Sequence, residues 1–156
     1  MFADIKINHP APNFKLKGIL NDQELIWNLS QMRGNWVLLF FYLADFNQTC
    51  EDEVIKFHQK SPEFKKRNCQ LFGCSTDSHY SHKAWVESLG GIDFPLLADV
   101  HHTTAIDYNV FMEEEAVCLS GSFLIDPNGA LKYYQISDPK IPRNIDEFLR
   151  ILDVLK

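Results

Sequence analysis

The stretch FFYLADFNQTCEDE, from Phe40 to Glu53, is an apolar run that passes through a short polar loop to a cysteine. The apolar run predicts a buried strand, and the residues after the loop predict the first turn of a helix that contains Cys50. Backbone N–H groups and the helix dipole favour a thiolate at such a position. Glu51, Asp52 and Glu53 follow at once, and acidic neighbours raise the pKa of a thiol. Two interpretations of Cys50 are therefore open: a reactive thiol, or a residue packed beneath the loop.

The length and charge of the chain limit the classes of protein it can belong to. Its 156 residues are expected to form one domain, residues 1–156, with a core of ordinary size. The net charge of −6 argues against a nucleic-acid partner, because phosphate contacts need clustered Lys and Arg. No apolar window is long enough to cross a bilayer, and the start, MFADIKINHP, lacks the basic flank and apolar core of a secretory signal. We therefore expect a cytosolic protein that binds neither nucleic acid nor membrane.

The four cysteines are expected to be free thiols, since no secretory signal accompanies them. None of them forms a C-x-x-C motif, which disfavours a thioredoxin-type dithiol exchanger. Cys69 and Cys74 flank a short apolar segment and are interpreted as buried packing. The spacing expected of a zinc site is missing. Four histidines could suggest a metal site, but a solvated surface is the favoured interpretation for them: His79, His82, His101 and His102.

Strand-like and helix-like segments alternate along the chain, which is typical of an α/β fold. The expected strands are a hairpin over Asn13–Leu29 around Asn21-Asp22, then Asn35–Tyr42, Leu71–Thr76, Phe94–Ala98, and a late hairpin of Ser122–Asp126 and Leu131–Ile136 around Pro127-Asn128-Gly129. The expected helices are Cys50–Lys66, with Thr49 and Asp52 in a capping box, then Asp77–Leu89, His102–Tyr108 and Asn144–Leu155. This order predicts a thioredoxin-like fold: a central mixed sheet flanked by helices, with an N-terminal β-hairpin extension.

Several blocks of the sequence carry a resemblance to one known family. They are HPAPNF (His9–Phe14), VLLFFYLADF before Cys50, TDSHYSHKAW (Thr76–Trp85), FPLLAD (Phe94–Asp99), GSFLIDPNGALK (Gly121–Lys132) and IPRNIDEFLRIL (Ile141–Leu152). With them, nearly the whole chain resembles a peroxiredoxin of the alkyl-hydroperoxide-reductase/thiol-specific-antioxidant group.

The resemblance implies a thiol peroxidase that needs no metal or organic cofactor. In that family a thiolate attacks the O–O bond of hydrogen peroxide or an organic hydroperoxide, and the protein is left with a sulfenic acid. Cys50 falls at the position of the attacking cysteine, Glu53 matches an acidic residue one turn later, and Arg143 matches an arginine that pairs with that acid. The implied partners are the peroxide, an external thiol reductant (thioredoxin-like or a small thiol) and a second copy of the chain in a homodimer.

Three signature positions differ from the family pattern. The family motif before the cysteine reads Pro-x-x-x-Thr-x-x-Cys, whereas this chain has Leu43 for the proline and Asn47 for the threonine. An arginine that holds the thiolate and polarises the peroxide corresponds here to Ser120. Loss of one preorganised donor typically costs a rate factor of about a hundred, although the Asn47 amide can donate in place of the threonine hydroxyl. We therefore expect a weakened or atypical peroxidase.

The second thiol of the reaction is less clearly marked. Some relatives carry it beyond the last helix, where this chain has none, and others carry it five residues after the first, where this chain has Ile55. Cys118 is the remaining candidate for a resolving cysteine, and a small residue at the start of a strand is its other interpretation. A cycle with Cys50 and an external thiol is simpler. The alternative to an enzyme is a peroxiredoxin scaffold that has lost catalysis and acts as a binding or regulatory partner.

Overall fold

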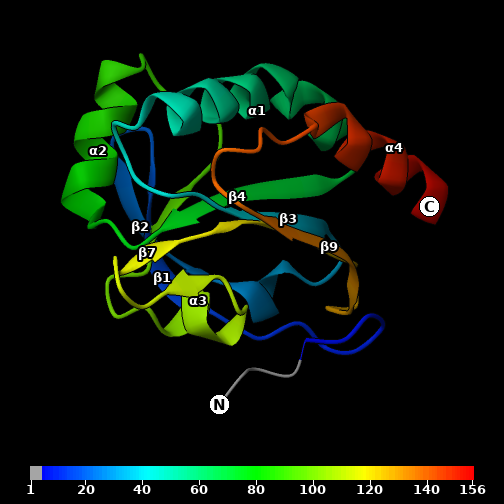
Figure 1. Cartoon of the computed structure of the whole chain (residues 1–156). Coiled ribbons are helices and arrows are strands. Elements are labelled where there is room, and N and C mark those ends of the chain that lie inside the picture. Colours follow the sequence, from blue (N-terminus) through cyan, green and yellow to red (C-terminus); the bar gives the residue numbers. More distant parts are fainter. Residues whose placement is uncertain (1–4) are drawn as a thin grey trace.

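The computed structural model describes residues 5–156, which build a seven-stranded mixed sheet between layers of helices (Figure 1). The strands of this sheet lie in the order β2-β1-β5-β4-β3-β8-β9, and β6 and β7 form a separate two-stranded sheet. The elements are β1 (Lys15–Leu20), β2 (Gln23–Asn28), the 3-10 helix η1 (Leu29–Met32), β3 (Trp36–Phe41), α1 (Gln48–Lys66), β4 (Cys69–Ser75), α2 (His79–Ser88), β5 (Leu96–Ala98), α3 (Thr103–Asp107), β6 (Phe111–Met112), β7 (Val117–Cys118), β8 (Ser120–Ile125), β9 (Leu131–Ser137) and α4 (Ile145–Leu155).

The central position of β3 follows from its composition. The strand WVLLFF is apolar throughout, as expected of a strand that is buried on both faces. It pairs in parallel with β4 and antiparallel with β8, so that both of its edges are hydrogen-bonded. Successive side chains point to opposite faces of a sheet. Leu38 and Phe40 therefore enter one core, while Leu39 and Phe41 enter the other.

Helices cover the two faces of the sheet unequally. Figure 1 shows α1, α2 and α4 on one face and α3 on the opposite face. The core beneath α1, α2 and α4, called here the α1-side core, contains Phe57, Trp85 and Phe148, one from each helix. The core on the other face, called here the α3-side core, contains Leu29 of η1 and Ala105 of α3. Among residues 5–156, no helix has the length and apolarity needed to cross a bilayer.

The predicted N-terminal hairpin is confirmed, and it extends the central sheet. β1 and β2 pair antiparallel around Asn21, and β1 also pairs with β5. Asn21 adopts a positive φ of 56°, which asparagine tolerates in tight turns. Its side chain accepts a hydrogen bond from the N–H of Ile92 at 3.0 Å, which ties the turn to the loop after α2. The expected α/β architecture, a mixed sheet flanked by helices, is thus observed.

The predicted capping box at the start of α1 is wrong. The N-cap is Asn47, whose backbone is extended and whose Oδ1 accepts the N–H of Cys50 at 3.1 Å. Thr49 is already helical, and Asp52 instead accepts a hydrogen bond from Gln48 Nε2 at 3.0 Å. Asparagine is as good an N-cap residue as serine and better than threonine. The helix therefore begins two residues earlier than predicted, and Cys50 is its third residue.

A proline inside α1 is compensated locally. Pro62 has no N–H to donate to the carbonyl of His58, one turn earlier. The hydroxyl of Ser61 donates to that carbonyl at 2.8 Å instead. The carbonyl therefore keeps a partner, and α1 continues to Lys66.

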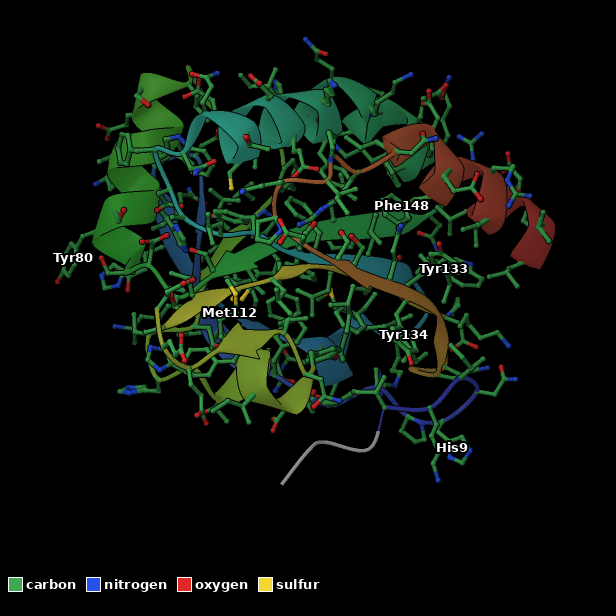
Figure 2. The ribbon with its side chains drawn as sticks, in the orientation of Figure 1. His9, Tyr80, Met112, Tyr133, Tyr134 and Phe148 are labelled. Carbon is green, nitrogen blue, oxygen red and sulfur yellow. The ribbon has the colours of Figure 1, made fainter. Side chains whose placement is uncertain are left out.

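The late hairpin of β8 and β9 is confirmed, and it packs on α4. Asp126 organises the turn, since its Oδ1 accepts N–H groups from Asn128 at 3.0 Å and Ala130 at 2.9 Å. Tyr133 and Phe148 contact edge to face with their ring centroids 6.4 Å apart (Figure 2). β6 and β7 are not predicted from the sequence, because strands of two residues are too short to show alternation.

Candidate functional site

Cys50 lies where the loop after β3 enters α1, and it is only 4% exposed. Three backbone N–H groups define its surroundings. Its own N–H is held by Asn47, and the N–H groups of Leu43 and Ala44 donate to its sulfur. Residues 43–47, called here the thiol loop, therefore wrap the cysteine from one side. Donors that face a sulfur in this way stabilise the thiolate more than the thiol.

The pKa of Cys50 is nevertheless raised above its ordinary value of 9.0. Burial is the largest cause, because it disfavours the charged form. The two loop amides act in the opposite direction and lower the pKa. Of the charges, Glu53 raises the pKa and Arg143 lowers it. The acidic run therefore acts on Cys50 chiefly through Glu53, and burial outweighs the cation.

Arg143 is the centre of a buried polar cluster next to the thiol. Its side chain is 4% exposed and that of Glu53 is 10% exposed, and Nε lies 3.7 Å from Glu53 Oε1. The backbone N–H of Arg143 donates to Glu53 Oε2 at 2.7 Å, so the acid binds both the side chain and the backbone of the arginine. The guanidinium also donates to the carbonyl of Phe41 and lies 5.2 Å from the ring centroid of Phe40. Burial lowers the pKa of Arg143, and Glu53 opposes that effect.

Ser120 completes this cluster. Arg143 Nε donates to Ser120 Oγ at 3.0 Å, and Nη1 donates to the carbonyl of Gly121 at 3.4 Å. The arginine therefore reaches the position at which the family resemblance places a second arginine. The structure brings together two sets of predicted site residues, Cys50 with Asn47 and Arg143 with Glu53 and Ser120, and electrostatics couples the two sets.

Cys118 interacts electrostatically with Arg143 but packs on the other face of the sheet from Cys50. It belongs to the α3-side core, whereas Cys50 belongs to the α1-side core, so the central sheet runs between the two sets of packing neighbours. Burial raises the pKa of Cys118 to about 12. All four cysteines are free and buried, which agrees with the interpretation of Cys69 and Cys74 as packing residues.

A buried network beside the thiol loop was missed by the sequence analysis. Tyr42 OH donates to Asp45 Oδ1 at 2.6 Å, and His82 Nδ1 lies 2.7 Å from Asp45 Oδ2. The expectation of a solvated surface is wrong for His82, which is 0% exposed. The helical spacing of His82, Trp85 and Val86 on one face of α2 is the signal that indicates its burial. Within residues 5–156, no group of three His, Cys, Asp or Glu side chains is placed to hold a metal ion.

The fold and the site together define a thioredoxin-like protein with a thiol held at the first turn of the helix after the central strand. A family model described as the AhpC/TSA family matches residues 7–134. The chain therefore belongs to the AhpC/TSA family, which confirms the resemblance seen in the sequence.

Individual relatives and solved structures agree with the family. The chain is 39% identical to Peroxiredoxin-4 of Dictyostelium discoideum over 97% of its own length, and it spans only 61% of that relative. It is 40% identical to Peroxiredoxin tpx1 of Schizosaccharomyces pombe, over 97% of this chain and 82% of the relative. The reduced 2-Cys peroxiredoxin of Plasmodium vivax superposes with a TM-score of 0.90 at 36% identity, over 96% of this chain and 95% of that one. AhpC of Enterococcus faecalis gives 0.92 at 31% identity, over 97% and 93%.

Proposed function

We propose that the protein is a thiol peroxidase whose reactive group is Cys50. The thiolate attacks one oxygen of the peroxide and the O–O bond breaks. Cys50 becomes a sulfenic acid, and the departing oxygen takes a proton to give water or an alcohol. The observation that carries this proposal is the position of Cys50 in a member of this family: the third residue of α1, with two amides of the thiol loop donating to its sulfur.

The neighbours of Cys50 are proposed to supply the polar groups that the reaction needs. Oδ1 of Asn47 already accepts the N–H of Cys50, which leaves the Nδ2 group as the donor that faces a bound peroxide. Arg143 provides positive charge, since it lowers the pKa of Cys50. Ser120 and Glu53 hold the guanidinium in place. With serine in place of the second arginine and the pKa of Cys50 raised, the enzyme is expected to be slower than a peroxiredoxin with the full motif.

An external thiol is proposed to reduce the oxidised protein. Cys118 and Cys50 pack on opposite faces of the sheet. A direct disulfide between them therefore requires the backbone around the two cysteines to rearrange. A thiol of a thioredoxin-type protein or a small thiol attacks the sulfenic sulfur and forms a mixed disulfide, while the sulfenic oxygen leaves as water. A second thiol then attacks the mixed disulfide, which releases Cys50 as a free thiol and leaves the reductant as a disulfide. The same requirement for a reductant supports a reducing compartment such as the cytosol.

We also propose that two copies associate through β9. This strand is the last in the sheet, so within residues 5–156 its outer side has no strand neighbour, and only its first residue, Leu131, bonds to the backbone of Asn8 and His9. Tyr134 and Ile136 on β9 are exposed apolar residues beside that edge. If β9 pairs antiparallel with β9 of a second copy related by a two-fold axis, the edge gains hydrogen bonds and the exposed apolar residues are covered. Sedimentation of the protein and of Ile136→Lys tests it: a dimer that the lysine weakens supports this interface.

The peroxidase proposal is tested by peroxide consumption. The reduced protein is mixed with hydrogen peroxide or an organic hydroperoxide in the presence of a thiol reductant, beside Cys50→Ser and Cys118→Ser. Dimedone trapping followed by mass spectrometry locates any sulfenic acid. Consumption that is lost only in Cys50→Ser, with trapping at Cys50, supports the proposal. A rate no faster than that of a free thiol, without trapping, overturns it and favours the alternative of a scaffold that has lost catalysis.

A further inference from the structure

His82 contacts hydrogen-bond acceptors through both of its ring nitrogens. Nδ1 lies 2.7 Å from Asp45 Oδ2, and Nε2 lies 2.9 Å from the carbonyl oxygen of Leu97. A carbonyl oxygen accepts hydrogen bonds and does not donate them, and the same holds for an ionised carboxylate. The ring is therefore held at both nitrogens, by Asp45 on one side and by the carbonyl of Leu97 on the other.

His82 and Asp45 are buried so deeply that neither side chain can be left without a polar partner. The side chains of His82 and Asp45 are 0% and 1% exposed. A buried charge without a partner is strongly unfavourable, whereas a hydrogen-bonded pair of opposite charges is tolerated. The other ionisable groups that face the pair are Tyr42, which donates to Asp45 and lies 3.4 Å from His82 Nδ1, and Asp77. Burial raises the pKa of Tyr42 well above its ordinary value, so the phenol remains a neutral donor.

Asp45 belongs to the thiol loop, so the contacts that hold its side chain also hold the loop. Both of its carboxylate oxygens are engaged, Oδ1 by Tyr42 and Oδ2 by His82. Its backbone N–H donates to Asp77 Oδ2 at 2.9 Å, and Asp77 is itself held by Ser75 Oγ at 2.8 Å. The residue is thus fixed by Tyr42 just after β3, by His82 of α2 and by Asp77 in the loop after β4. The next residue toward the N-terminus is Ala44, whose N–H donates to the Cys50 sulfur.

We propose that His82 is a positioning residue for the Cys50 site: through Asp45 it holds the thiol loop so that the amides of Leu43 and Ala44 face the sulfur. The chain of contacts runs from α2 to the loop and from the loop to α1, and His82 itself does not touch the reacting atoms. The proposal deepens the proposed function, because it names what keeps the thiolate donors in place. The hold on Asp45 rests on the hydrogen bonds that it makes with His82, Tyr42 and Asp77.

The ionisation of Cys50 tests the proposal without peroxide or reductant. Protein labelled with 13C at cysteine Cβ is titrated by NMR, and the Cys50 signal is assigned by its absence in Cys50→Ser. His82→Gln keeps a side chain of similar size but offers a single amide group in place of two ring nitrogens that contact Asp45 and Leu97. His79→Gln on the same helix is the matched control, because His79 contacts Glu24 and Tyr80 near the surface. Circular dichroism confirms that each variant is folded.

The expected result is an upward shift of about one pH unit in the Cys50 midpoint of His82→Gln, a tenfold lower thiolate fraction at a given pH. His79→Gln should leave the midpoint unchanged. An unchanged midpoint in folded His82→Gln, or an equal shift in His79→Gln, overturns the proposal. If His82→Gln does not fold, Tyr42→Phe decides, since it removes one donor to Asp45 and keeps the ring that packs on Trp85. A shift in the same direction supports the proposal, and none overturns it.

The test separates this proposal from the proposed function. A protein that consumes no peroxide can still show the shift, which leaves the positioning role of His82 intact and overturns only the peroxidase. Conversely, peroxide consumption through Cys50 with no shift in His82→Gln keeps the enzyme and removes the positioning role.

Discussion

Replacing Arg143 with methionine is expected to destabilise the protein far more than the loss of a surface cation. The side chains of Arg143 and Glu53 are 4% and 10% exposed, and they lie 3.7 Å apart. Arg143→Met leaves the Glu53 carboxylate buried without its counter-charge and removes the donors to Ser120 and Gly121. Breaking a buried pair from one side costs about 3–5 kcal/mol. We expect the free energy of unfolding to fall by that amount.

The measurement is guanidinium denaturation at pH 7, followed by fluorescence and circular dichroism. Arg150→Met is the matched control, because the side chains of Arg150 and Glu147 are 65% and 36% exposed and solvent screens their ion pair. Adding Glu53→Gln to Arg143→Met removes the unpaired charge and is expected to recover part of the loss. A cost for Arg143→Met below about 1 kcal/mol, or no recovery in the double variant, refutes the reasoning that an uncompensated charge dominates.

Three further outcomes follow from the local geometry. Asn47→Ala removes the N-cap of α1 and should lower the free energy of unfolding by about 1 kcal/mol, whereas Asn47→Asp should retain most of it; equal losses in denaturation contradict this. Gly121→Ala places a Cβ 2.6 Å from Val110 Cγ1, so thermal denaturation should show a loss of about 1–3 kcal/mol, and an unchanged melting temperature contradicts it. Burial raises the pKa of Cys69 and Cys118 from 9.0 to about 12. Each thiol therefore contributes stability that is present below pH 9 and is lost as the pH rises toward 12, and denaturation in Cys69→Val should show a smaller alkaline loss.

The features predicted correctly from the sequence depend on local pattern. The apolar run of β3 and the turn chemistry of Pro127-Asn128-Gly129 are contained in a few consecutive residues, so they predict a strand and a hairpin without knowledge of the fold. The cysteine at the start of α1 was found in the same way. The N-cap was misplaced because Asn47, Gln48 and Thr49 all lie within the uncertainty of a helix boundary, and the backbone conformation of Asn47 decides among them.

The features that the sequence did not reveal depend on residues far apart in the chain. The helical spacing of α2 indicates that His82 is buried, but it does not identify its partner Asp45, 37 residues earlier. Arg143 and Glu53 are 90 residues apart in the sequence, and the packing of α4 against α1 brings them into contact. The alternation of apolar residues fixes which face of an element is buried. It does not specify which polar side chains meet beneath that face.

The order of strands in the sheet has a consequence for synthesis of the protein on the ribosome. β3 is apolar throughout, and its antiparallel neighbour β8 is separated from it by roughly 80 residues of chain, which take about 4–16 s to translate. Until β8 emerges, one edge of β3 has no partner in the finished register. Exposed apolar edges of this kind favour aggregation. A chaperone that binds nascent chains is therefore expected to be needed most during that interval, and a truncation that ends before Ser120 should be insoluble.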